Sequence, residues 1–255
     1  MIYKISNYVT YNKGMASSIA DKCWWIDSIS NNIDTVIDYG CATGELFAYL
    51  ETKYPNRFKH YIGIDNDNKM LEVAKSRNLK NASFYTSLNK VEVNGPNTIL
   101  ILNSVIHEIL TYNGEDFLIH ILSIAKDKKI YAVAIRDMFY SNNFNDETAR
   151  VANEFISRKQ KPKTWYSHKV HCRCKNKCRM LQEYLLKYRY TENWDREVRE
   201  RYLWDWDSMV KSMLPNYCTR KEFTFFIPQQ RANIKRELHI DWNVDTHKKM
   251  LLVSG

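Results

Sequence analysis

The first 140 residues alternate short apolar runs with stretches of amphipathic, helical spacing. Five of the apolar runs have the length and composition of buried strands. Apolar strands joined by helical crossovers form a parallel sheet with helices on both faces. The pattern therefore predicts a doubly wound α/β fold. The expected strands are residues 35–39, 60–65, 82–86, 98–102 and 129–135.

The pattern changes after Asp137. Helical spacing dominates there, and two late apolar runs, 222–227 and 249–253, have the character of strands. We expect a mostly parallel, seven-stranded sheet that is interrupted by a mainly helical, basic insert before its last two strands. The predicted parts are a Rossmann-like core with an N-terminal helix (1–140), the insert (141–207) and the strands that complete the sheet (208–255). The expected helices are residues 15–29, 43–54, 67–77 with Asp67 as N-cap, 105–110, 117–125, 144–160, 180–189 and 195–202.

The stretch VIDYGCATGEL, residues 36–46, places two of the chain's seven glycines directly after the first predicted strand. Sheets of this kind bind ligands at the carboxyl ends of their strands. Glycine at that edge lets the backbone pass close to a bound molecule. Gly40 and Gly44 are separated by three residues, unlike the G-x-G-x-x-G spacing that seats a pyrophosphate. The spacing therefore disfavours a dinucleotide cofactor.

The second predicted strand ends in Asp65, within YIGIDNDNKML. An acidic residue at this position accepts hydrogen bonds from ribose hydroxyls in nucleoside-binding sheets. Alone, such a residue is more often a simple cap or turn residue. Its combination with the glycine loop one crossover earlier favours a ligand that contains a nucleoside.

Together, VIDYGCATGEL, YIGIDNDNKML and ILILNSVIHEI resemble the cofactor motifs of the class I S-adenosylmethionine-dependent methyltransferases, over residues 35–137. The resemblance implies S-adenosylmethionine as the cofactor and a sheet that ends in a β-hairpin. Another nucleoside-binding, Rossmann-like protein is the alternative. The cofactor contacts that the resemblance implies are Asp38, Gly40, Cys41 and Gly44 beside the methionine part, Asp65 at the ribose, Asn66, Met70 and Ser87 near the adenine, and Asn103 and Ser104 near the sulfonium.

The family commonly places substrate-facing groups after the fourth strand, where His107 and Glu108 stand in this chain. The intrinsic pKa of histidine lies near physiological pH, so His107 is a candidate base toward a hydroxyl or an amine. Glu108 is a candidate for the same step, or for orienting a neighbour. Arg136 is the third catalytic candidate; Arg136 and Asp137 end the fifth predicted strand and either bind substrate or pair with each other. A His–Glu pair at a helix start also serves as a simple cap, and that interpretation stays open.

The chain carries 38 Lys and Arg residues against 29 Asp and Glu, a formal net charge of +9. A basic domain is compatible with phosphate-rich partners, and equally with a coding bias toward lysine. Residues 158–206 combine cations with aromatic side chains, which bind phosphates and stack on bases in single-stranded nucleic acid sites. An ordinary helical cover with buried aromatic residues and solvated lysines is the alternative.

Several nucleic-acid methyltransferase motifs are missing from the chain. The fourth predicted strand is followed by neither Asp/Asn-Pro-Pro-Tyr/Phe nor a Pro-Cys pair, and Asn103 stands where ribose 2′-O enzymes carry an Asp. The motifs therefore do not identify the methyl acceptor.

Five potential metal ligands lie close together within the predicted insert. Their spacing differs from that of common zinc fingers, so we assign no metal and leave zinc open. We expect free thiols whose pKa is lowered by the surrounding basic charge. The five residues are His168, His171, Cys172, Cys174 and Cys178.

The sequence thus predicts a methyltransferase that uses S-adenosylmethionine and acts on a nucleic acid or nucleotide. A small-molecule methyltransferase with the insert as a lid is one alternative. A non-catalytic, cofactor-binding subunit that stimulates a partner enzyme is another. The first residues lack the apolar stretch of a signal peptide and no window is long enough to span a membrane, so we expect a cytoplasmic protein without a membrane partner. The sequence leaves the oligomeric state open, and a protein partner is compatible with it.

Overall fold

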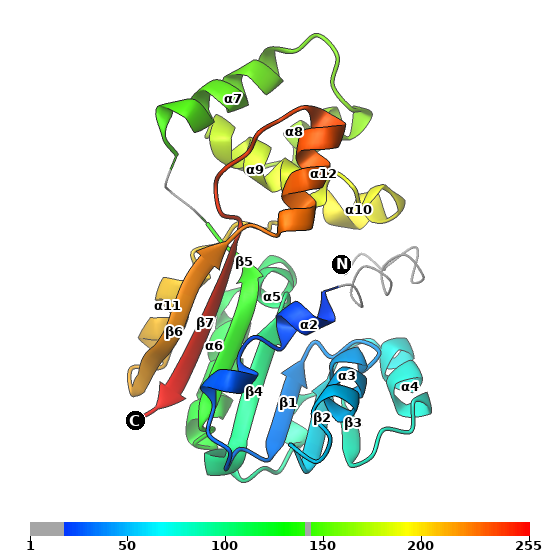
Figure 1. The fold of residues 1–255 in the computed structure, drawn as a ribbon, viewed down its shortest axis with the longest axis vertical. Coiled ribbons are helices and arrows are strands. Elements are labelled where there is room, and N and C mark those ends of the chain that lie inside the picture. Colours follow the sequence, from blue (N-terminus) through cyan, green and yellow to red (C-terminus); the bar gives the residue numbers. More distant parts are fainter. Residues whose placement is uncertain (1–17, 141–143) are drawn as a thin grey trace. The chain divides into compact units, whose positions relative to one another are not determined.

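The computed structural model describes residues 18–140 and 144–255. It divides the chain into two compact units, each with its own hydrophobic core (Figure 1). We call them the core unit, which comprises residues 18–137, Trp206–Glu222 and Lys249–Gly255, and the helical unit, which comprises Met138–Asp205 and Phe223–Lys248.

The core unit is built on a seven-stranded sheet in the order β3-β2-β1-β4-β5-β7-β6. β1 pairs in parallel with both β2 and β4, so Thr35 lies opposite His60 on one side and Thr98 on the other. The chain passes from β1 to β2 and β3 on one side and then continues with β4 on the other, so the topological switch point lies between the carboxyl ends of β1 and β4. β7 runs against its neighbours in Figure 1, and the sheet is mostly parallel, as predicted. The strands are β1 (Thr35–Tyr39), β2 (His60–Ile64), β3 (Ala82–Tyr85), β4 (Thr98–Asn103), β5 (Ala132–Met138), β6 (Tyr217–Phe225) and β7 (His247–Ser254).

The central strands are buried along their whole length, because helices cover both faces of the sheet. Every residue of β4 and of β5 is buried. Such strands read as near-continuous apolar runs, which is why the sequence places them within a few residues of their observed bounds. The helices of the core unit are α2 (Ile19–Lys22), α3 (Glu45–Lys53), α4 (Asn68–Ser76), α5 (Ile106–Tyr112), α6 (Glu115–Asp127) and α11 (Trp206–Met213).

The start of α4 and the end of α2 show how the local sequence decides the bounds of helices in the core unit. Asp67 caps α4, as predicted, and its Oδ1 accepts a hydrogen bond from Lys69 N at 2.9 Å. The helix predicted over residues 15–29 is wrong in its described part, since α2 ends at Lys22 and a separate 3₁₀ turn, Ile26–Ser28, follows. The break lets the fully buried Trp25 enter the core together with its neighbours, which a continuous helix would place on different faces.

The helical unit consists of two excursions from the sheet. The first lies between β5 and β6, within the predicted insert, and the second lies between β6 and β7, where the sequence assigned no helix. In the second, Pro228 begins α12 at a position where proline favours helix initiation. No helix among the described residues is both long enough and apolar enough to cross a membrane. The helices of this unit are α7 (Asp146–Ser157), α8 (Lys163–His171), α9 (Lys177–Lys187), α10 (Trp194–Glu197) and α12 (Pro228–Leu238).

Aromatic side chains form the core of the helical unit. Trp165 and Tyr184 are fully buried, with their ring centroids 5.2 Å apart and their planes nearly perpendicular. Phe155 and Trp242 belong to the same cluster. These buried aromatic residues, of which Trp242 lies outside the predicted insert, hold the helical unit together and do not form a stacking surface. A helical cover with buried aromatic residues was the alternative left open by the sequence.

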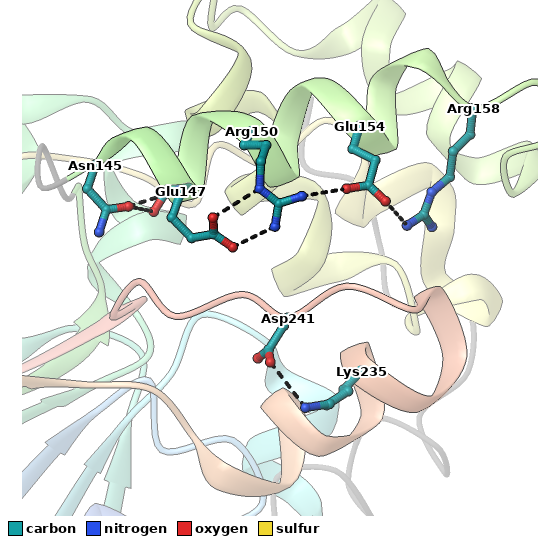
Figure 2. A network of polar contacts seen from close by, with 8 residues as sticks. Asn145, Glu147, Arg150, Glu154, Arg158, Lys235 and Asp241 are labelled. Carbon is teal, nitrogen blue, oxygen red and sulfur yellow. Dashed lines mark hydrogen bonds and ion pairs between the residues drawn. The ribbon is translucent and has the colours of Figure 1, made fainter.

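One side of α7 carries a row of exposed ion pairs (Figure 2). Arg150 pairs with Glu147 at 2.7 Å and with Glu154 at 3.2 Å, at helical spacings of three and four residues. Exposed pairs of this kind contribute a few tenths of a kcal/mol each. The row therefore stabilises α7 locally and leaves little free charge on that face.

Candidate functional site

A pocket lies in the core unit at the switch point of the sheet, where β1 ends beside β4. Four predicted cofactor residues line it: Asp38, Gly40, Cys41 and Asn103. The other lining residues are Ile19, Lys22, Ala42, Thr43, Glu45 and Leu46.

The glycine loop forms one wall of this pocket. Gly40 and Gly44 have φ angles of +81° and +74°, which other residues rarely adopt. A Cβ at position 40 would lie 2.8 Å from Cγ2 of Val105, so position 40 also lacks the space for a side chain. The loop is held down by Gly40 N and Cys41 N, which both donate to Ile64 O, at 2.7 and 3.0 Å. Two independent constraints thus explain the glycine that the sequence pointed to.

Asp65 anchors the same loop from the neighbouring strand. Its Oδ2 accepts a hydrogen bond from Ala42 N and its Oδ1 accepts one from Asp67 N, both at 2.9 Å. Burial raises the pKa of Asp65, and the nearby charge of Glu108 adds to the effect. Each carboxylate oxygen can accept a second hydrogen bond, so these contacts leave capacity for hydroxyl donors.

Asp38 and Lys22 place opposite charges in the pocket. Asp38 is 6% exposed and Lys22 is 5% exposed. Burial raises the pKa of Asp38 to about 7, against the attraction of Lys22. Burial likewise lowers the pKa of Lys22 to about 8, against the attraction of Asp38.

Asn103 ends β4 beside this pair. Its Nδ2 donates to Lys22 O at 3.4 Å, which ties α2 to the end of the sheet. Its Oδ1 is buried and has no hydrogen-bond partner within the described residues. A buried acceptor without a donor costs about 1–3 kcal/mol, so this oxygen marks a place where a ligand donor fits.

Asp21, also on α2, binds two buried cations. Its Oδ2 accepts from Arg136 Nε at 2.6 Å, and its Oδ1 accepts from Lys249 Nζ. Although burial acts in the opposite direction, these two cations lower the pKa of Asp21. Arg136 also donates from Nη1 to Ser104 Oγ at 3.0 Å. The predicted residues Arg136 and Ser104 therefore lie in one polar network with α2.

His107 lies in the first turn of α5 and forms a dyad with Asp137 of β5. The two are joined by His107 Nδ1 and Asp137 Oδ1 at 2.8 Å, and both side chains are buried. Asp137 Oδ2 also accepts from Ile106 N at 2.7 Å and from His107 N at 3.3 Å, so it caps α5. A proton on Nδ1 that is bound to a carboxylate makes Nε2 the basic nitrogen of the ring.

The dyad bears on the relation between Arg136 and Asp137, for which the sequence left two alternatives open. Arg136 binds Asp21 and Ser104, whereas Asp137 binds His107. The two residues are neighbours in β5, and successive side chains of a strand point to opposite faces. Because β5 extends through both residues, this alternation separates their side chains.

The remaining predicted residues lie after the carboxyl ends of β1, β2 and β3, in the first turn of α4 and at the start of α5. Asn66 is exposed, Met70 is buried, and Ser87 caps the 3₁₀ turn Leu88–Lys90 by accepting from Asn89 N at 3.3 Å. The thiol of Cys41 lies against Gly63 of β2, and burial raises its pKa. Glu108 is partly exposed in α5.

Asp21 and Lys22 are among the site residues that the sequence interpretation missed. Lys22 follows Ile19 by three residues, on the side of the predicted helix that carries its apolar residues. A lysine on an apolar helix face is a usable signal, because a fully buried lysine requires a partner. The partner itself, Asp38, is distant in sequence and was not paired with it.

The His/Cys cluster of the helical unit does not form a metal site in the described structure. No three of its members bring ligand atoms within 4.8 Å of one another. His168 is buried, with Nε2 3.0 Å from Met180 O, and Cys172 Sγ donates to Glu183 Oε2 at 3.6 Å. The expectation of lowered thiol pKa values is wrong, since burial and Glu183 raise the pKa of Cys172 to about 12.

Comparisons with solved structures identify the fold. The pyocyanin biosynthetic protein PhzM superimposes with a TM-score of 0.53 at 12% identity, over 94% of this chain and 55% of PhzM. The plantazolicin methyltransferase BamL, in complex with a triazolic desmethylPZN analog and SAH, gives 0.51 at 11% identity, over 96% and 88%. PKMT2 from Rickettsia typhi gives 0.50 at 12% identity, over 89% and 49%. This chain thus spans about half the length of PhzM and of PKMT2.

No family model matches the chain, and no curated protein matches it. The fold itself is that of the class I methyltransferases, as the sequence motifs predicted.

Proposed function

We propose that the chain is a methyltransferase that uses S-adenosylmethionine. The observation that carries the proposal is the pocket at the switch point, where Asp38, Lys22 and the unpaired Oδ1 of Asn103 converge beside the glycine loop. This set complements a ligand end that carries both an ammonium and a carboxylate. The class I methyltransferase fold supports the same cofactor.

The residues present fit S-adenosylmethionine. Asp38 and Asn103 Oδ1 would accept hydrogen bonds from its ammonium, and Lys22 would pair with its carboxylate. Asp65 has acceptor capacity for the ribose hydroxyls beyond its two backbone contacts. When bound, the cofactor supplies a methyl group on a positively charged sulfur, and the protein contributes mainly binding and orientation.

The His107–Asp137 dyad is the proposed base. Asp137 holds the ring through Nδ1, so Nε2 accepts the proton of an acceptor hydroxyl or amine. The contacts of Arg136 support a positioning role, because its guanidinium binds Asp21 and Ser104. Glu108 is proposed to orient the acceptor, since it lies one residue from His107 and partly faces solvent.

For the methyl acceptor we propose a nucleic acid or a nucleotide. The net charge of +9 supports an anionic acceptor. A small molecule or peptide is the second candidate, supported by the names of two structural neighbours, a pyocyanin biosynthetic protein and a plantazolicin methyltransferase.

Calorimetric titration with S-adenosylmethionine and S-adenosylhomocysteine tests the proposal. We expect wild type to bind both, Asp38→Asn and Asp65→Ala to lose most of the affinity, and Asp116→Asn, an exposed carboxylate of α6, to behave as wild type. Transfer of a labelled methyl group to RNA, DNA, nucleotides and small hydroxylated or amino compounds then identifies the acceptor. Absence of cofactor binding by the folded wild type would overturn the proposal.

A further inference from the structure

The positive charge of the chain is concentrated in one segment of the helical unit. Residues 155–182 contain nine Lys or Arg and no Asp or Glu. The other 29 Lys and Arg residues equal the 29 Asp and Glu residues, so this segment accounts for the whole net charge of +9. A general coding bias toward lysine would not leave the rest of the chain balanced.

The structure separates these cations into two groups. Some serve the fold: Arg158 donates to Leu238 O and His239 O, at 2.6 and 3.0 Å, and its guanidinium also approaches Glu154 (Figure 2). Arg179 lies 3.5 Å from the ring centroid of Tyr140. The cations that are exposed and have no hydrogen bond or ion pair within the described residues are Lys159, Lys163, Lys169, Arg173 and Lys175.

Most of these exposed cations lie in α8 or in the loop after it. The two sides of α8 differ in character. Trp165 and His168 are buried in the core of the helical unit. On the other side Lys163, Tyr166 and Val170 recur at helical spacing. We call the exposed residues of α8 and of the loop that follows it the α8 face: Lys163, Tyr166, Lys169 and Val170 of the helix, and Arg173 and Lys175 of the loop.

Two apolar side chains stand among the cations of the α8 face. Tyr166 is 51% exposed and Val170 is 81% exposed, the highest values among the large apolar side chains of the described structure. An exposed ring between cations is the combination that binds single strands, because cations meet phosphates while the ring stacks on a base. A surface that binds an anion through charge alone would not require an exposed aromatic ring.

We propose that the α8 face binds a single-stranded nucleic acid. The inference rests on the proposed function only in taking a nucleic acid as the methyl acceptor. Four unpaired cations track the phosphates, and Tyr166 stacks on one base. α8 has nine residues and exposes two apolar side chains, which is little apolar area for insertion into a membrane surface.

Fluorescence anisotropy with labelled oligo(U) and oligo(dT) of 20 nucleotides, between 50 and 200 mM salt, provides the test, with the salt range chosen for counterion release. The α8 variant is Lys163→Gln/Lys169→Gln/Arg173→Gln. The matched control is Lys53→Gln/Lys75→Gln/Lys126→Gln, three exposed lysines in the last turns of core-unit helices. The third variant is Tyr166→Ala. Thermal unfolding and calorimetry with S-adenosylhomocysteine report on the fold and the cofactor site of each variant.

We expect wild type to bind and the α8 variant to lose about two units of the slope of log K against log salt, because each phosphate contact contributes roughly 0.7. Tyr166→Ala should weaken binding about tenfold, and the control should match wild type. Equal losses in the two triple variants, or no binding by wild type, would overturn the proposal. If polyglutamate competed as well as the oligonucleotides do, the α8 face would be assigned to an acidic peptide. If the protein bound phosphatidylserine vesicles and no oligonucleotide, the face would be assigned to a membrane.

The two proposals fail separately. Oligonucleotide binding without binding of S-adenosylhomocysteine would refute the cofactor site alone. Cofactor binding without oligonucleotide binding would refute the α8 face alone.

Discussion

Replacing Asp21 by Asn removes the anion that α2 places between two buried cations. Asp21 accepts from Arg136 Nε at 2.6 Å and from Lys249 Nζ, and the side chains of both cations are almost fully buried. The variant keeps the size of the side chain and loses its charge. Arg136 and Lys249 then lose the carboxylate that both of them bind, and α2 loses its side-chain link to β5 and β7.

The expected loss of unfolding free energy depends on how deeply Asp21 and its two cationic partners are buried. Breaking a fully buried pair costs about 3–5 kcal/mol, because a charge is left without compensation. The side chain of Asp21 is 40% exposed, so water screens part of the interaction. We therefore expect unfolding free energy to fall by about 2 kcal/mol, which lowers Tm by about 4–8 °C in a chain of this size. Binding of S-adenosylhomocysteine should weaken about tenfold, because α2 also carries Lys22 into the pocket.

A double-mutant cycle with Lys249→Met separates this explanation from a general weakening of the fold. The two substitutions remove the same interaction, so their effects on unfolding free energy should be non-additive by about 1 kcal/mol or more. Asp27→Asn, at an exposed position of the adjoining 3₁₀ turn, is the matched control and should leave stability and affinity unchanged. Additive effects of Asp21→Asn and Lys249→Met, to within about 0.3 kcal/mol, would refute the reasoning.

Three further outcomes follow from the site. Asp137→Asn keeps an oxygen that caps α5 but no longer fixes the His107 ring, so kcat for methyl transfer should fall about 100-fold while calorimetry shows unchanged affinity for S-adenosylhomocysteine. Gly40→Ala forces a Cβ to 2.8 Å from Val105 at positive φ, so denaturant unfolding should show a loss of about 1–3 kcal/mol and cofactor binding should be lost. Binding of S-adenosylhomocysteine should weaken about fivefold between pH 8 and pH 6, because protonation of Asp38 weakens it about tenfold while protonation of Lys22 strengthens it about twofold; a calorimetric series on Asp38→Asn should lose this weakening.

Local patterns in the chain were sufficient for the core of the fold. The strand predicted over 35–39 coincides with β1, because a run of apolar residues ended by Asp38, Tyr39 and a glycine reads clearly at both ends. Gly40 was identified because the glycine loop directly follows its strand in the sequence, and the positive φ angle that requires glycine is a property of that one residue.

Long-range pairing was what the sequence did not supply. The Asp21–Arg136 ion pair spans 115 residues and the Asp21–Lys249 pair spans 228. Nothing in local spacing selects Asp21 as the partner of Arg136, and the strand alternation that separates Arg136 from Asp137 required the bounds of β5. α12 was missed because a segment of charged and polar residues after Pro228 carries little apolar periodicity.

The charged pair in the pocket is better explained by a ligand than by stability. The pKa of Asp38 is raised from 3.8 to about 7, so its favourable contribution is present at low pH and is lost as pH rises through 7. The pKa of Lys22 is lowered from 10.5 to about 8, so its favourable contribution is present at high pH and is lost as pH falls through 8. Between pH 7 and 8 both charged groups therefore disfavour the folded chain. The ligand proposed above, with its ammonium at Asp38 and its carboxylate at Lys22, would compensate both charges.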